Sequence, residues 1–286
     1  MIGNTLETRF LPDDLHPLWS HHRDEIEANL ILRSDYGTRT LREALEGVES
    51  VFLCFTNRVS SNLLTDFLEQ AGFGVRVAEE DLNSESVLAA TKMYNLAAFD
   101  EYLAYVVNQT KRNGTFFCKV GAPQLFWLAN RGFLPDFFGS SKFIFVRRQD
   151  KIAQSVSLFI ANSTGRYLKQ ASDLENEPSI KPSFDRIEIV KCLRDILNSE
   201  RLFHYFFALH SISALQVWYE EFVSTPRAVI SEVAQFCGQE SQSWLHINGV
   251  DVSNARLQSQ SSELNEIMCR EMRATFSLSG ADFQIS

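Results

Sequence analysis

The segment KFIFVRRQDKIAQSVSLFI, residues 142–160, contains signals for a strand, a turn and a helix in immediate succession. Lys142 to Val146 is a short run rich in aromatic and branched residues, which is typical of a buried strand. Asp150 is a good N-cap, and the apolar residues behind it recur at helical spacing. Those residues are Ile152, Ala153, Val156, Phe159 and Ile160. Arg147 and Arg148 therefore come at the point where the strand passes into the helix.

A second unit of the same kind lies upstream. Ser50 to Thr56 is an apolar run, residues 57–62 are polar, and Leu63 to Phe73 places its apolar residues on one helical face. Thr115 to Lys119 and Ala214 to Tyr219 predict two further strands. Between and after these strands we expect helices at about 86–112, 187–209 and 226–236. Strands that alternate with helices predict an α/β fold with a mainly parallel central sheet flanked by helices.

The chain has 286 residues, of which 45% are hydrophobic, and this is enough for one large core. We expect an N-terminal extension, residues 1–48, to pack on a main domain formed by residues 49–286. No window approaches the roughly 18 apolar residues of a membrane span, and charged residues such as Glu7 and Arg9 occur where a signal peptide would be apolar. A cytoplasmic location without a transmembrane segment is expected. The sequence leaves monomer and homodimer open.

The formal net charge of −9 disfavours nucleic acid as a partner, because such proteins cluster Lys and Arg against phosphates. Any anion site must therefore be local. The five cysteines are scattered, mostly in apolar runs, which indicates reduced core thiols. Neither a CxxC pair nor histidines at ligand spacing occur, so no metal is expected.

Two strand-to-helix junctions carry basic and hydroxyl side chains. The first combines Arg58 with Ser60, Ser61 and Asn62. The second combines Arg147 and Arg148 with Ser155 or Ser157, about two turns into the following helix. In open α/β sheets such junctions lie at the ligand-binding edge. Two of them suit a ligand with two separated anionic groups. The first loop has neither the Gly nor the Lys of a Walker A motif, which disfavours a kinase or ATPase.

These junctions resemble the motifs of one family. Residues 58–64, Arg-Val-Ser-Ser-Asn-Leu-Leu, resemble its R-S-G-S-T-L-L motif, and residues 147–157 closely match its R-R-x-D-x-x-x-Q-A-x-S motif. Gln70-Ala71-Gly72 and then Glu79-Glu80 continue the first motif in register, where the family has an ATG-type turn and an acidic stretch. Two weaker similarities are Lys119 after the next strand and residues 219–238. The chain thus resembles, over about residues 50–260, the bacterial trehalose 2-sulfotransferase-like family, relatives of the nodulation sulfotransferases with a P-loop-like sulfotransferase fold.

The resemblance implies an enzyme that transfers a sulfuryl group from 3′-phosphoadenosine 5′-phosphosulfate (PAPS) to a hydroxyl, leaving adenosine 3′,5′-bisphosphate (PAP). The acceptor would be a carbohydrate, glycolipid or similar small molecule, and no metal would be required. Arg58, Ser60, Ser61 and Asn62 would hold the phosphosulfate, and Arg148 and Ser157 the 3′-phosphate. Arg58 would also stabilise the leaving oxygen, and Glu79, or failing it Glu80, would accept the acceptor's proton. We further expect Arg256 to close over the donor.

The chain departs from the family motif at several positions. Ser60 replaces the Gly of the first loop and Asn62 replaces its Thr, and loss of the Gly could crowd the phosphosulfate. The family's acceptor-side aromatic residue, which ends a Q-T-x-x-W pattern near the end of the second helix, is Tyr167 here, after Thr164-Gly165-Arg166, so the resemblance does not point to trehalose as the acceptor. The alternative is therefore a catalytically degenerate protein of this fold that binds a nucleotide or a partner.

Overall fold

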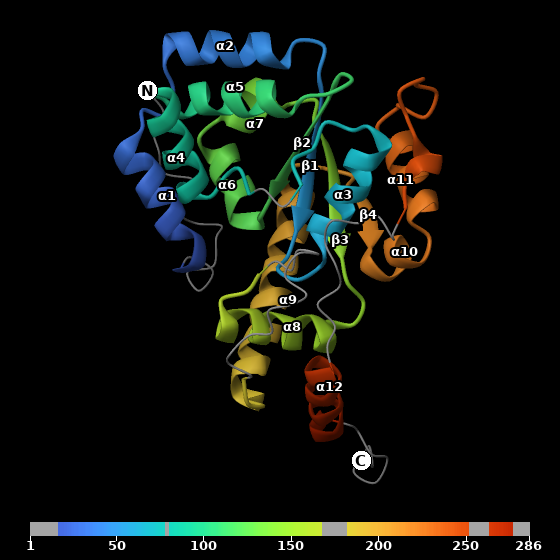
Figure 1. Cartoon of the computed structure of the whole chain (residues 1–286). Helices are drawn as coiled ribbons and strands as arrows, with labels where there is room; N and C mark the ends of the chain where they lie inside the picture. The colour runs from blue at the N-terminus through green and yellow to red at the C-terminus, as the bar shows by residue number, and fades with distance from the viewer. Residues whose placement is uncertain (1–16, 78–79, 168–181, 252–262, 277–286) are drawn as a thin grey trace.

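The computed structural model describes residues 17–77, 80–167, 182–251 and 263–276. Its central sheet has four strands in the order β2-β1-β3-β4, and every pairing is parallel (Figure 1). The strands are β1 (Glu49–Phe55), β2 (Thr115–Val120), β3 (Lys142–Arg147) and β4 (Leu215–Trp218). These ranges differ from the predicted ones by at most one residue at each end, and the predicted α/β fold with a parallel sheet is confirmed.

Helices cover both faces of the sheet, because successive side chains of each strand point to opposite sides. Phe52 and Cys54 of β1 pack in one core cluster with most of the helices, whereas Val51 and Leu53 pack in another. The first cluster takes in α1 (Pro17–Asn29), α2 (Asp35–Leu45), α4 (Ser84–Tyr94), α5 (Phe99–Thr110), α6 (Ala122–Asn130), α7 (Phe133–Phe137) and part of α9 (Arg186–Leu209). The second takes in α3 (Ser61–Ala71), α10 (Tyr219–Ser224) and α11 (Pro226–Phe236), with the short 3-10 helix η3 (Ile247–Gly249) beside α3.

A third apolar cluster lies beyond the sheet. It joins α8 (Lys151–Thr164), the first half of α9 and α12 (Glu263–Phe276), which form the lower end of the molecule in Figure 1. From α12 it contains Met268, Cys269 and Met272. The C-terminal helix is therefore attached to the protein mainly through α8.

The prediction of one continuous helix at about 86–112 is wrong. The structure has two helices there, because α4 ends at Tyr94 and its C-cap Asn95 has a φ of 52°, in the left-handed region. Asparagine adopts this conformation more readily than most residues. The chain after it is extended, and the backbone of Ile31 bonds to both Ala97 and Phe99. Apolar residues continue across this break, so the pattern alone did not reveal it. The predicted helices at 187–209 and 226–236 are confirmed as α9 and α11.

The described residues that precede β1 pack in the same core as the sheet. Leu41 and Ala44 of α2 are buried in the first cluster, and α2 packs along α5. The fully buried carboxylate of Asp100 accepts hydrogen bonds from the backbone N–H of Ser34 and from the hydroxyl of Thr38, and the Ser34 hydroxyl donates to the neighbouring Glu101 at 3.1 Å. The start of α2 is thereby fixed on α5. The division of the chain after residue 48 stays a prediction.

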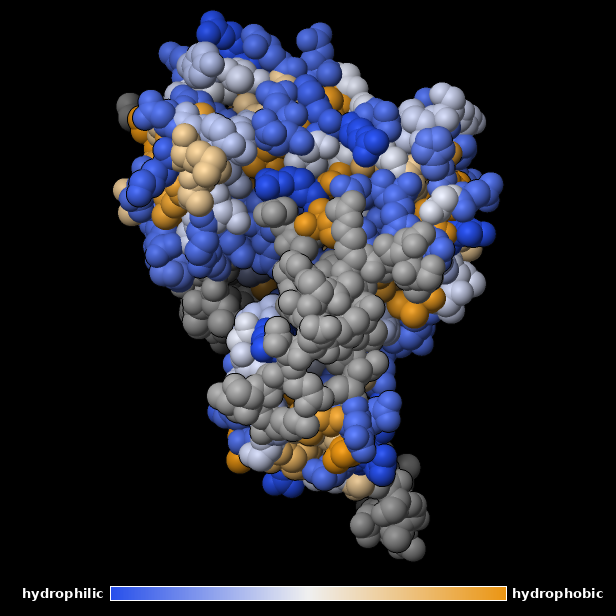
Figure 2. Space-filling model, in the orientation of Figure 1, coloured by the Kyte–Doolittle hydropathy of each residue, from blue (hydrophilic) through white to orange (hydrophobic). Residues whose placement is uncertain are grey.

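All five cysteines are free and buried, as predicted. Burial raises the pKa of Cys237 to about 12 and that of Cys192 to about 11, so these thiols stay protonated at neutral pH. On the face shown in Figure 2 the described surface is mainly hydrophilic, with apolar side chains in small scattered groups. Among the described residues, no helix has the length and apolarity needed to cross a membrane.

The buried Asp100 gives a test of how the N-terminal helices are held. We expect Asp100→Ala to lower the free energy of unfolding by about 2–4 kcal/mol, because it leaves buried donors without an acceptor. Urea denaturation followed by circular dichroism measures this. Glu43→Ala, which removes an exposed carboxylate from α2, should change the free energy by less than about 0.5 kcal/mol. Equal effects of the two substitutions would show that apolar packing alone holds α2.

Candidate functional site

The carboxyl ends of β1 and β3 bring two loops together at one edge of the sheet. The strands are parallel neighbours, with Phe55 of β1 paired to Val146 of β3. The loop after β1, residues 56–60, therefore lies beside the turn after β3, residues 148–150. Ligands of parallel α/β proteins bind at this edge.

The loop after β1 contains two residues in the left-handed region, and neither is glycine. Arg58 has φ of 67° and Ser60 has φ of 61°. This conformation costs an L-residue roughly 1–2 kcal/mol, and such strain is concentrated at functional sites. Ser60 precedes α3 without a capping bond from its side chain, and Ser61 is the buried first residue of the helix. A glycine at position 60 would adopt this conformation without strain.

Side chains of α8 hold this loop in place. The amide nitrogen of Gln154, which is fully buried, donates to the Thr56 hydroxyl at 2.9 Å and to the Asn57 carbonyl at 2.7 Å. One turn further along, the Ser157 hydroxyl accepts from Nε of Arg58 at 3.0 Å. Ser155 instead donates to the carbonyl of Ile152 in its own helix. Of the two serines that the sequence left open, Ser157 is the one that contacts the loop.

Lys119 joins the site from β2. Its ammonium group donates to the side-chain oxygen of Asn62 and lies 5.1 Å from the centre of the Phe55 ring. Only 4% of Lys119 is exposed, so a positive charge is buried at the strand ends. Sequence reasoning had noted Lys119 only as a weak similarity and had not counted it among the site residues. The side-chain oxygen of Asn62 therefore accepts a hydrogen bond from Lys119.

Arg148 faces the first loop from the turn after β3. Its guanidinium lies over the Tyr219 ring at 4.6 Å, and its Nε is buried without a hydrogen-bond partner among the described residues. Burial lowers the pKa of Arg58, and the positive charge of Arg148 lowers it further. Arg58 and Arg148, both predicted as site residues, thus lie close enough at the carboxyl edge of the sheet for their charges to repel.

Arg147 has different surroundings from its neighbour Arg148. Its guanidinium lies over the Trp218 ring at 4.6 Å, donates to the side chain of Gln216 at 3.1 Å and lies 3.6 Å from the buried carboxylate of Glu200. These contacts attach β3 to β4 and α9. Arg147 is therefore a structural residue, and Arg148 is the arginine of the pair that faces the site.

Two carboxylates accept hydrogen bonds from the backbone N–H groups at the N-terminus of α8. The Glu220 carboxylate accepts from the backbone N–H groups of Gln149 and Asp150, and the Asp150 carboxylate accepts from that of Ala153. Free backbone N–H groups at a helix start commonly form an anion site. Two carboxylates at the helix start make it a poor one, and the positive charge at this edge comes from the guanidinium groups.

One of the two candidate bases lies within the described residues. Glu80 accepts from the amide nitrogen of Asn83 at 2.7 Å, and Asn83 in turn accepts from Gln124 at 3.2 Å. Gln124 also accepts from the backbone N–H of Gly121, directly after β2. This chain of bonds fixes Glu80 relative to the end of β2. Glu79 and Arg256 lie outside the described residues, so their predicted roles stay predictions.

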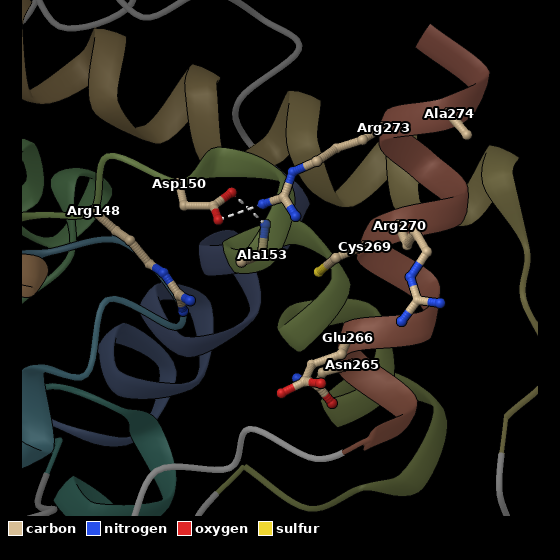
Figure 3. A pocket seen from close by; sticks show the side chains of 9 residues that line it. All are labelled: Arg148, Asp150, Ala153, Asn265, Glu266, Cys269, Arg270, Arg273 and Ala274. Carbon is tan, nitrogen blue, oxygen red and sulfur yellow. Dashed lines mark hydrogen bonds and ion pairs between the residues drawn. The ribbon is translucent and has the colours of Figure 1, made fainter. Parts of the chain in front are cut away.

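A pocket of about 690 Å³ opens beside Arg148 (Figure 3). On one side it is lined by the turn into α8, and on the other by α12. Figure 3 shows the guanidinium of Arg273 reaching across from α12 to the Asp150 carboxylate, at 2.5 Å. The described residues contain no group of three or more His, Cys, Asp or Glu side chains that could hold a metal ion.

These observations define an α/β protein with a cationic site at the carboxyl edge of a parallel sheet. Residues 122–266, just over half of the chain, match the Stf0 sulphotransferase family, and the protein belongs to that family. The matched residues include β3, α8 and Arg148, whereas the Arg58 loop lies before them. No curated protein matches the chain. Membership of the family supports sulfotransferase activity in general.

The strained loop after β1 gives a second prediction. Ser60→Gly should raise the free energy of unfolding by about 1 kcal/mol, because glycine removes the left-handed strain and no capping bond is lost. The same substitution one residue later, Ser61→Gly, should lower it by about 0.5 kcal/mol, because Ser61 has helical backbone. Thermal and urea denaturation of the three proteins measure both changes. A destabilised Ser60→Gly protein would show that the serine side chain itself supports the loop.

Proposed function

We propose that the protein transfers a sulfuryl group from PAPS to a hydroxyl of a carbohydrate, glycolipid or similar small acceptor. One observation carries the proposal: two arginines on neighbouring strand-end loops lie within electrostatic range of each other, in a chain of a sulfotransferase family. Two like charges held together are suited to a ligand that brings negative charge between them. A donor with a phosphosulfate at one end and a 3′-phosphate at the other meets this requirement.

The residues present fit such a donor. Arg58 and Lys119, with the hydroxyls of Ser60 and Ser61 and the amide of Asn62, would hold the phosphosulfate. Arg148 would hold the 3′-phosphate through its guanidinium group, and Ser157 links the two parts of the site through Arg58. Arginine suits this role because its planar fork matches phosphate oxygens. Arg256, outside the described residues, is proposed to close over the donor.

When bound, PAPS supplies an activated sulfuryl group: the acceptor oxygen bonds to sulfur while the bond from sulfur to the bridging oxygen breaks and PAP departs. Arg58 stabilises the charge that develops on this oxygen, which is electrostatic catalysis by a preorganised group. The proton of the acceptor hydroxyl passes to a carboxylate, Glu79 or Glu80. Glu80 is already oriented by Asn83 and Gln124 at the end of β2.

We further place the protein in the cytoplasm, which its five free and buried cysteines support, since reduced thiols are typical of that compartment. It would need neither a metal nor a nucleic acid. A homodimer is compatible with the proposal. The competing function, a degenerate protein that binds a nucleotide without catalysis, is favoured by the glycine-free loop, because two strained residues lie where the phosphosulfate would bind.

Adjacent arginines give a matched test of donor binding. We expect Arg148→Ala to weaken the binding of PAP by roughly 10–100-fold, the effect of losing hydrogen bonds to a charged group. Arg147→Ala should leave PAP affinity within about twofold, because this arginine binds Gln216 and packs on Trp218. Isothermal titration calorimetry measures both. Equal losses for the two variants, or no PAP binding by the unmodified protein, would contradict the proposal.

Catalysis is tested separately from binding. With radiolabelled PAPS and a panel of sugars and glycolipids, we expect transfer to an acceptor hydroxyl. Of Glu79→Gln and Glu80→Gln, one should lower kcat by about 10²–10⁴-fold with PAP affinity unchanged, as expected for loss of a general base. The other is its matched control. Tight PAP binding with no transfer to any acceptor would favour the degenerate protein instead.

A further inference from the structure

The long helix α9 carries apolar side chains on its outer face, where a surface helix is normally polar. Its inner face packs in two of the core clusters, through residues such as Cys192 and Phe203. Along the opposite face, large apolar side chains recur with between 38% and 63% of their surface exposed. They are Ile187, Val190, Leu197, Tyr205 and Leu209. Their exposure shows that no described element covers this face.

Basic side chains lie between these apolar ones. Ile187, Arg194 and Arg201 are spaced seven residues apart, so they form one line along the helix. Both arginines are exposed, and neither forms an ion pair with another described residue. The exposed carboxylates of Glu188 and Asp195 point about 100–120° away from this line, at about 100° per residue. The outer surface of α9, here called the α9 face, is therefore apolar and cationic in a chain with a formal net charge of −9.

A second copy of the chain fits the α9 face poorly. Two α9 helices packed antiparallel about the middle of the face would place Arg194 of one copy opposite Arg201 of the other. In a parallel pair each arginine would lie opposite its own equivalent, so like charges would oppose each other in both arrangements. A helix from another protein would bury both guanidinium groups, which costs free energy unless each meets a matched carboxylate.

An anionic lipid surface suits both properties of the α9 face. Apolar side chains enter the boundary between headgroups and acyl chains, while arginines extend their guanidinium groups to the lipid phosphates. A tyrosine such as Tyr205 fits this boundary, because its ring is apolar and its hydroxyl can stay hydrated. From Ile187 to Leu209 the face is about 33 Å long, at about 1.5 Å per residue. Lipid therefore accommodates the arginines without desolvating them.

We propose that the α9 face docks the protein on a membrane surface that contains anionic phospholipid. The apolar side chains enter the interface, and Arg194 and Arg201 contact the lipid phosphates. The inference goes beyond the proposed function and does not rest on it, because this binding needs neither PAPS nor an acceptor. A protein held at lipid would meet lipid-linked molecules at a raised local concentration, which suits the glycolipid among the proposed acceptors.

Co-sedimentation with vesicles tests the role of the two arginines. We expect the protein to bind vesicles of phosphatidylcholine and phosphatidylglycerol in equal parts, and to bind vesicles of phosphatidylcholine alone far more weakly. Arg194→Gln combined with Arg201→Gln should weaken binding to the mixed vesicles roughly 25-fold, about fivefold for each charge near an anionic surface. Arg39→Gln combined with Arg42→Gln removes the same charge from exposed arginines of α2 and should change binding by less than about twofold.

Leu197→Ser tests the apolar part of the face. It should weaken binding to the mixed vesicles roughly tenfold, because the serine no longer places methylene and methyl groups in the interface. Met93→Ser is the matched control, since Met93 is 74% exposed on α4 and lies outside the α9 face. It should leave binding unchanged. Circular dichroism shows that each variant is folded before it is compared.

The possible outcomes are distinct. Losses in the α9 variants, with binding kept in both controls, support the inference. No binding of the unmodified protein to the mixed vesicles would overturn it. Equal losses in the two double variants would indicate an effect of net charge alone and would also overturn it. A homodimer that sedimentation equilibrium detects and that Leu197→Ser dissociates would show that the α9 face binds a second copy instead of lipid.

Discussion

The parallel pairing of β1 with β3 is the constraint on which the rest of the structure depends. Each strand is buried on both faces, with Phe52 and Cys54 packed in one core and Val51 and Leu53 in the other. A shift of one residue would exchange the two sets and mismatch both cores, so the register is fixed from two sides. The fixed register also sets the positions of the loops that follow β1 and β3. Arg58 and Arg148 lie near each other because the packing of the two cores determines where β1 and β3 end.

Several features of the cationic edge cost free energy in the folded protein. Two residues of the first loop have left-handed backbone, two arginines repel each other, and Lys119 is buried. Other contacts offset these costs by holding the loop rigidly, above all the hydrogen bonds from Gln154. Sites that bind or react commonly break the rules that the rest of a fold obeys. An anion between the guanidinium groups would relieve the repulsion, whereas the strain of the loop would remain.

Much of this architecture could be predicted from the sequence, because its signals are local. Apolar runs predicted the strands, and the position of Arg58 and Arg148 directly after two of these strands indicated that they belong to the site. The order of the strands could not be predicted, since it depends on which cores match in space. The break at Asn95 was missed because apolar residues continue across it. Gln154 and Lys119 were not counted as site residues because their partners, Thr56 and Asn62, are distant in sequence.

The burial of every cysteine has a practical consequence. Raised pKa values keep the thiols of Cys54, Cys118, Cys192, Cys237 and Cys269 in the protonated form, which reacts slowly with alkylating reagents. A cysteine introduced at an exposed position would then be labelled ahead of all the native ones. The wild-type background therefore suits fluorophores or spin labels placed at exposed positions of α12, and no natural thiol has to be removed first.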